Sequence, residues 1–195
     1  MIGENISVQD RDLLGRLSAY FDHIDARLRE GQGWLIFNAD RGRARRIVQF
    51  IGDRLREYRP LVSSYLVPWR DFALNAYMLK VELVGNGALA NDESADPRQQ
   101  HEYAIAGRVS QDMYYQMCYC DLFVLNGLDP SYRHEVGYLD QILGERYLNR
   151  RASILITPRM PHELATSFES IAPQYGSEAW KRLFRQLYDT SLLAL

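Results

Sequence analysis

Lysine is almost absent from this sequence of 195 residues. Of its 23 basic residues, only Lys80 and Lys181 are lysines, and all the others are arginines. Neither lysine lies in a glycine-rich segment, where a lysine beside bound phosphate is normally found. Any chemistry that depends on a lysine must therefore use Lys80 or Lys181.

Cysteine and histidine are also scarce. Cys118 and Cys120 are separated by one residue, which is too close for an unstrained disulfide, so we expect both to be buried thiols on a strand. The four histidines are scattered without the spacing of metal ligands. No Gly-x-Ser-x-Gly pentapeptide is present to form a nucleophile elbow. The sequence therefore predicts neither a metal site nor a serine hydrolase.

Long apolar runs are missing as well. No run approaches the roughly 18 to 20 apolar residues that a membrane span needs, and the polar N-terminal residues resemble no targeting segment. We therefore expect a cytoplasmic protein without membrane contact. The net charge of −2 gives no indication of nucleic acid binding, although it leaves room for a local basic patch.

The chain does contain an alternation of short apolar runs and amphipathic segments. The runs predict strands at 34–37, 64–67, 121–125 and 153–157, and the amphipathic segments predict helices at 10–29, 44–58, 69–83, 103–117, 132–149 and 177–188. A polar loop is expected at 85–100. Such alternation predicts an α/β fold with three layers, in which helices cover both faces of a parallel sheet.

Residues 120–164 carry the most informative order of elements. A strand ending at Leu125-Asn126 is followed by a long helix that ends in Ile142-Leu143-Gly144-Glu145-Arg146-Tyr147, and then by a strand ending in Ile-Thr157. Together with the rest of 33–183, this order resembles the AAA+ ATPase core of bacterial helicase loaders and transposition ATPases of the DnaC and IstB type. The resemblance implies a P-loop NTPase-like fold, with an N-terminal helix packing on the core at 1–32, an α/β core at 33–160 and a truncated helical lid at 161–195.

The resemblance also places a phosphate loop after the first strand, but its chemistry is degenerate. The family's lysine would fall at Ala44 or Arg45, no serine or threonine follows to hold magnesium, and Asp40 would repel phosphate. A planar guanidinium is not equivalent to the smaller ammonium group of lysine. We predict a solvated basic helix start, with weak ATP or ADP binding as the alternative. The residues of this degenerate loop are Asn38, Asp40, Arg41, Gly42, Arg45 and Arg46.

Two further sites of the family are degenerate. The strand that should end in two acidic Walker B residues ends in Asn126-Gly127, and we expect the nearby Asp129 to start a turn and cap the next helix. The sensor-like residues are Thr157 and Arg159. Because positioning and charge stabilisation are lost together, we predict no catalytic residue and no appreciable ATP hydrolysis.

One element of the family's machinery remains. The segment around Lys181-Arg182-Leu183 resembles the one that carries the arginine finger, so Arg182 is a candidate to complete the active site of a neighbouring subunit. The alternative is a helix whose apolar side faces the core while Arg182 is solvated.

These observations favour a catalytically inactive, AAA+-like adaptor or regulatory subunit. Its expected partner is another protein, such as a competent AAA+ ATPase or a helicase, in DNA replication, transposition or mobile-element biology. One alternative is a nucleotide-binding module without hydrolysis that depends on Arg45 or Arg46. The other is a purely structural domain that forms homo-oligomers, with Trp34, Phe37 or a tyrosine filling the nucleotide crevice.

Overall fold

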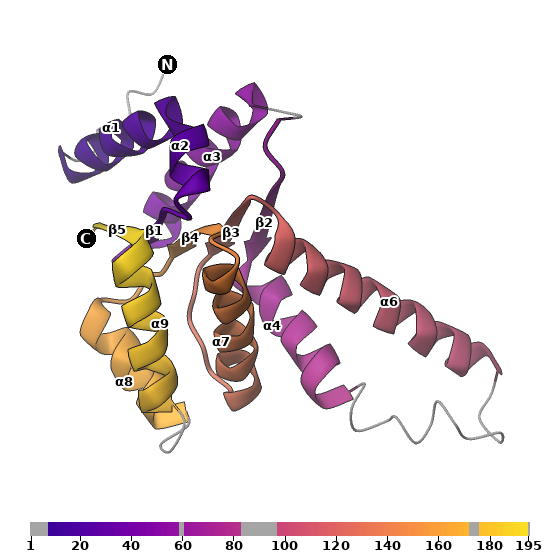
Figure 1. Ribbon diagram of the computed structural model, residues 1–195. Helices are drawn as coiled ribbons and strands as arrows, with labels where there is room; N and C mark the ends of the chain where they lie inside the picture. Colours follow the sequence, from indigo (N-terminus) through magenta and orange to yellow (C-terminus); the bar gives the residue numbers. More distant parts are fainter. Residues whose placement is uncertain (1–7, 59–60, 83–96, 172–175, 195) are drawn as a thin grey trace.

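A parallel sheet of five strands forms the centre of the protein (Figure 1). The computed structural model describes residues 8–58, 61–82, 97–171 and 176–194. The strands lie side by side in the order β2-β3-β4-β1-β5. Their bounds are Gly33–Ile36 for β1, Ser64–Pro68 for β2, Leu122–Asn126 for β3, Ala152–Ile156 for β4 and Ser191–Ala194 for β5.

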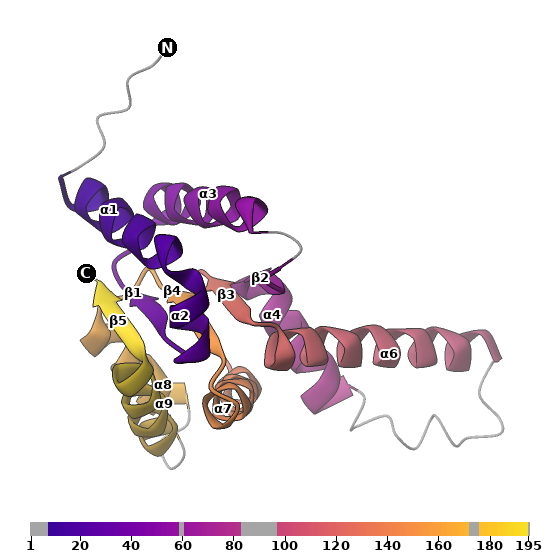
Figure 2. The same ribbon diagram turned by 45° about the horizontal axis from the view of Figure 1, so that its top comes forward.

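Helices cover both faces of this sheet (Figure 2). One face packs against α1 (Val8–Asp22), α2 (Ile24–Arg29) and α3 (Arg41–Glu57). The other packs against α4 (Trp69–Tyr77), α6 (Pro97–Tyr119), α7 (Arg133–Leu148), α8 (Pro161–Ile171) and α9 (Gly176–Thr190). A short π-helix, η1 (Met78–Glu82), continues α4. The predicted three-layer α/β fold is confirmed.

Strand β1 shows how the sequence builds this sandwich. Its residues are all buried, as expected for a strand with helices on both faces. Trp34 and Ile36 point into the core beneath α1, α2 and α3, whereas Leu35 and the following Phe37 belong to the opposite core. The alternation follows from the two-residue period of a strand.

The single helix predicted at 10–29 is divided in the structure. It breaks at His23 into α1 and α2, and Leu17, Phe21 and Ile24 are buried against the sheet and α3. The predicted loop at 85–100 falls mostly at 83–96, outside the described residues, and 97–100 already belong to α6. Cys118 and Cys120 are buried and free as expected, but they lie at the end of α6 and just after it, not on a strand.

The prediction of a truncated helical lid at 161–195 needs correction. Pro161 is the first residue of α8, where a missing N–H costs nothing. The following α9 packs against α7 and α8, and it leads into β5, which pairs in parallel with β1. The α/β core therefore extends beyond residue 160, up to Ala194.

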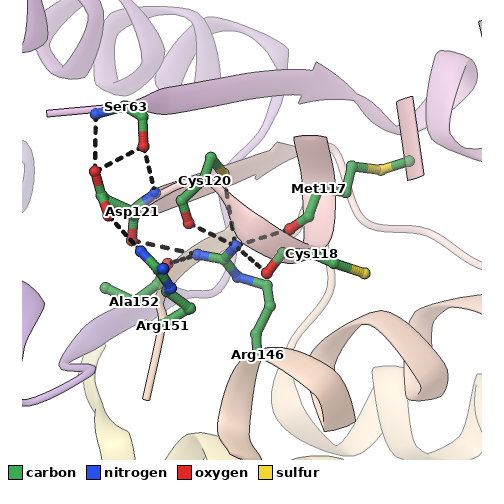
Figure 3. Close-up of polar contacts among 8 residues, drawn as sticks. All are labelled: Ser63, Met117, Cys118, Cys120, Asp121, Arg146, Arg151 and Ala152. Atoms are coloured by element: carbon green, nitrogen blue, oxygen red, sulfur yellow. Dashed lines mark hydrogen bonds and ion pairs between the residues drawn. The ribbon is translucent and has the colours of Figure 1, made fainter. Parts of the chain in front are cut away.

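A buried arginine joins several of these elements at the amino ends of β3 and β4 (Figure 3). Arg146, near the end of α7, is 1% exposed. Its guanidinium donates to the carbonyl oxygens of Met117 at 2.8 Å and Cys120 at 3.0 Å, and to that of Ala152, while its Nε donates to Ser153 Oγ at 2.9 Å. It thereby satisfies carbonyls that the end of α6 and the following turn leave without a helical partner. Burial lowers the pKa of Arg146 from its ordinary value.

A carboxylate beside this arginine fixes the same edge to β2. Asp121 Oδ2 accepts hydrogen bonds from Ser63 N at 3.0 Å and Ser63 Oγ at 2.6 Å, and Oδ1 pairs with Arg151. Burial acts to raise the pKa of Asp121, but the Ser63 hydrogen bonds and the Arg151 guanidinium outweigh it and leave the pKa below its ordinary value. Asp121 thus ties the residue before β2 to the start of β3.

We predict that Arg146→Lys lowers the free energy of unfolding by about 2–4 kcal/mol, because an ammonium group cannot reach all the carbonyls that the guanidinium satisfies. Urea denaturation followed by circular dichroism measures the loss. The matched control is Arg133→Lys, at the exposed start of the same helix, which should change stability by less than about 0.5 kcal/mol. Equal stability of the two variants would contradict the role assigned to Arg146.

Candidate functional site

The carboxyl ends of the parallel strands bring the predicted site residues to one edge of the sheet. Ile36 of β1 is in register with Ile156 of β4, which is in register with Asn126 of β3. The chain after β1 turns into α3 on one face, and the chain after β4 turns into α8 on the other. Such a reversal creates the crevice in which doubly wound α/β proteins bind their ligands.

The backbone N–H groups of the loop between β1 and α3 are bonded to other parts of the chain. The N–H groups of Asn38 and Ala39 donate to the carbonyl oxygens of Arg159 at 3.1 Å and Thr157 at 2.9 Å. Asp40 is the N-cap of α3, and its Oδ1 accepts from the N–H of Arg43 at 2.7 Å. In a functional phosphate loop, N–H groups at the helix start bind the anion. Here a carboxylate of the same chain takes one of them.

Arg43 lies inside this loop and is 7% exposed. Its Nη1 donates to the carbonyl oxygens of Phe37 at 3.3 Å and Asn38 at 3.1 Å, and its Nε lies 2.9 Å from Asp10 Oδ1. The other oxygen of Asp10, from α1, pairs with Arg46. The loop is therefore held closed by a buried ion pair between α1 and α3.

The phosphate-loop pattern can also be aligned on Gly42. With Gly42 as the second glycine of the Gly-x-x-x-x-Gly-Lys-Ser/Thr pattern, Arg43 stands at the lysine and Ala44 at the hydroxyl residue, whereas the predicted alignment has Ala44 or Arg45 at the lysine. Both Arg43 and Asp10 were missed as site residues. The Gly42-Arg43 pair, in place of Gly-Lys, could have pointed to Arg43. No local pattern in the sequence points to Asp10.

The chain turns at the end of β3, at Asn126 and Gly127. Asn126 is half-buried, and its Oδ1 is enclosed without a hydrogen-bond partner among the described residues. Gly127 has a φ of 79°, in the left-handed region that glycine adopts without strain, and its N–H donates to the carbonyl oxygen of Ile156 at 2.9 Å. The backbone at position 127 therefore disfavours any side chain.

The sensor-like residues contact this turn. Thr157 is fully buried, and its hydroxyl donates to the carbonyl oxygen of Leu128 at 2.7 Å. Arg159 Nε donates to Asp129 Oδ1 at 2.9 Å. The expectation that Asp129 caps the next helix is wrong, because Glu135 Oε2 accepts from the N–H groups of Ser131 and Tyr132 at the start of α7.

The remaining predicted residues are divided between core, crevice and surface. Trp34 and Phe37 lie in the two hydrophobic cores, so neither fills a crevice as the structural alternative supposed. Arg41 and Arg45 face a crevice of about 790 Å³ between α3 and α4. Arg182 is half-exposed on α9, where its Nη2 lies 2.8 Å from Asp140 Oδ2 of α7. Its role as an arginine finger remains a prediction.

This arrangement does not fit magnesium and ATP. Within the described residues, no cluster of three or more His, Cys, Asp or Glu side chains is placed to hold a metal ion. Arg43 is buried in the loop after β1 and paired with Asp10, and Asn126 and Gly127 at the end of β3 carry no carboxylate.

No membrane span is found among the described residues. None of their helices has the length and apolar character needed to cross a membrane.

Comparison with solved structures identifies the fold. The DnaC helicase loader superposes with a TM-score of 0.59 and 13% sequence identity, over 96% of this chain and 90% of that one. A putative primosome component from Streptococcus pyogenes serotype M3 superposes with a TM-score of 0.59 and 11% identity, over 96% of this chain and 79% of that one. The chain therefore shares the fold of these two structures. Comparisons with protein-family models and with curated proteins give no match.

We predict that Asp10→Ala lowers the free energy of unfolding by about 3–5 kcal/mol, because it leaves the buried guanidinium of Arg43 without its carboxylate. Chemical denaturation measures this change. Asp12→Ala is the matched control, since Asp12 is 71% exposed and lies 4.0 Å from Arg16. This control should lose less than about 1 kcal/mol, and a similar loss in both variants would contradict the role of Asp10.

The two glycines of the site should respond in opposite ways to alanine. A β-carbon at Gly42 would lie at ordinary contact distance, 3.5 Å from Asp40 Oδ1, so Gly42→Ala should keep or raise stability by up to about 1 kcal/mol. Gly127→Ala should lower stability by about 1–2 kcal/mol, because its φ of 79° strains an L-residue. Thermal denaturation of both variants gives the comparison, and a destabilised Gly42→Ala protein would contradict the prediction.

Proposed function

We propose that this chain is a catalytically inactive, AAA+-like adaptor or regulatory subunit that binds another protein. The observation that carries the proposal is the buried Arg43 guanidinium, which fills the phosphate loop and pairs with Asp10. A phosphate entering this loop would have to displace Arg43 from two carbonyl oxygens and a carboxylate. Breaking a buried pair of this kind costs several kcal/mol.

The other two sites support the same conclusion. Asn126 and Gly127 provide no carboxylate for a metal or for a water molecule, and Thr157 is already bonded to the carbonyl oxygen of Leu128. Arg159 is paired with Asp129. Each side chain that would be needed for phosphoryl transfer is either missing or engaged in a contact that stabilises the turn.

The partner is proposed from the fold. One structure that shares it is a helicase loader and the other is a putative primosome component. We infer that the present chain acts in DNA replication or a related process, with a helicase or a competent AAA+ ATPase as its partner. Because fold alone does not determine function, this part of the proposal depends on direct binding measurements.

We predict no release of phosphate from ATP above the buffer rate, and no calorimetric heat when ATP or ADP with magnesium is titrated to millimolar concentration. An Arg45→Ala, Arg46→Ala double variant should behave identically. Micromolar binding that this variant loses would instead favour the non-hydrolysing nucleotide module. Hydrolysis that scales with protein concentration would contradict the proposal.

The binding role has its own measurement. The chain is mixed with the replicative helicase of the same organism, with and without nucleotide, and the mixture is analysed by size-exclusion chromatography with light scattering. Co-elution at a defined stoichiometry, independent of nucleotide on this chain, supports the adaptor role. Elution as a homo-oligomer with no bound partner supports the structural alternative.

A further inference from the structure

The crevice beside the closed phosphate loop carries unpaired positive charge. It lies between α3 and α4, at the carboxyl end of β3, with a volume of about 790 Å³. Its lining includes Arg41, Arg45, Trp69, Arg70, Asn126 and Tyr132. A volume of this size accommodates a few side chains or one small ligand.

Three guanidinium groups converge on this crevice from two walls. Arg41 and Arg45 are four residues apart on α3 and therefore share one face of that helix, and Arg70 lies in the first turn of α4 opposite. All three are exposed, and in the described part of the chain none of them makes an ion pair or a hydrogen bond through its side chain. By contrast, Arg43 and Arg46 pair with Asp10, and Arg159 pairs with Asp129.

The acidic groups that line the crevice are already engaged. Asp129 pairs with Arg159, and Glu135 accepts from two N–H groups at the start of α7. Helices α3, α4 and α7 all begin at this edge of the sheet, and the start of a helix carries partial positive charge. Arg41, Arg45 and Arg70, together with the helix starts, therefore outweigh the charge of Glu135 and leave the crevice positive.

The chemistry of the walls favours carboxylates over polyphosphate. Guanidinium groups bind carboxylates through two parallel hydrogen bonds, and opposing walls allow more than one such pair. A polyphosphate is normally bound together with magnesium, and Asn126 and Gly127 offer no carboxylate to hold that ion. Trp69 and Tyr132 add aromatic surface on which an apolar side chain can pack.

We propose that this crevice is the docking site for an acidic segment of a partner protein, whose carboxylates pair with Arg41, Arg45 and Arg70. An apolar residue of the segment packs against Trp69 and Tyr132. The inference rests on the proposed binding role, and it specifies where the partner binds and the chemistry that recognises it. Single-stranded nucleic acid is the competing ligand, since arginine and aromatic residues also bind it, but its backbone would need a basic groove that continues beyond one crevice.

The test measures fluorescence anisotropy with a fluorescein-labelled decapeptide of alternating Glu and Asp that contains one central Leu. We expect binding that weakens at least tenfold in the Arg41→Gln, Arg45→Gln, Arg70→Gln variant and as salt is raised. The control variant, Arg56→Gln, Arg108→Gln, Arg185→Gln, removes the same charge from exposed helical positions outside the crevice. It should bind within twofold of the unmodified chain.

Three outcomes overturn the docking site. These are no binding of the peptide, an equal loss in both triple variants, and tighter crevice-dependent binding of a labelled twenty-residue oligothymidylate. The last result would assign the crevice to nucleic acid. Circular dichroism of each variant establishes that it is folded. Failure of this inference is separable from failure of the proposed function, because ATP hydrolysis and helicase binding are measured without the peptide.

Discussion

The buried ion pair between Asp10 and Arg43 determines the arrangement of the carboxyl edge of the sheet. It joins the N-terminal layer to the loop after β1, and the same guanidinium holds the carbonyl oxygens of Phe37 and Asn38. A charge this deeply buried is tolerated only because a carboxylate and several acceptors surround it. With the loop closed in this way, the exposed positive charge at the start of α3 belongs to Arg41 and Arg45, which face the neighbouring crevice.

Different arginine side chains have different roles in this protein. Arg146 stabilises the opposite end of the sheet by donating to carbonyl groups at the end of α6 and near the starts of β3 and β4. Arg43 closes a loop, and Arg70 remains exposed on α4. A guanidinium suits the two buried positions because it has five donors in a fixed plane, which an ammonium group cannot replace. At Arg43 and Arg146, therefore, the structure requires an arginine that lysine could not replace.

The sequence predicted the elements whose signals are local. Four strands and the layered fold followed from apolar runs and helical periodicity. The sequence also shows directly that Asn126 and Gly127, at the end of β3, carry no carboxylate. The contact between Asp10 and Arg43 could not be predicted, because it joins segments far apart in the chain and leaves no periodic pattern. Strand β5 was missed since four residues, Ser191 to Ala194, follow a helix and are too few to distinguish a strand from its continuation.

The position of β5 in the sheet has a consequence for folding. Strand β1, near the start of the described chain, lies between β4 and β5, so it acquires its second neighbour only from residues 191–194. Pairings this distant in sequence carry a large entropy of loop closure and slow the folding of a sheet. Until β5 docks, β1 is an edge strand whose unpaired backbone groups are available to other chains. The last residues of the fold therefore protect one of its earliest strands from aggregation.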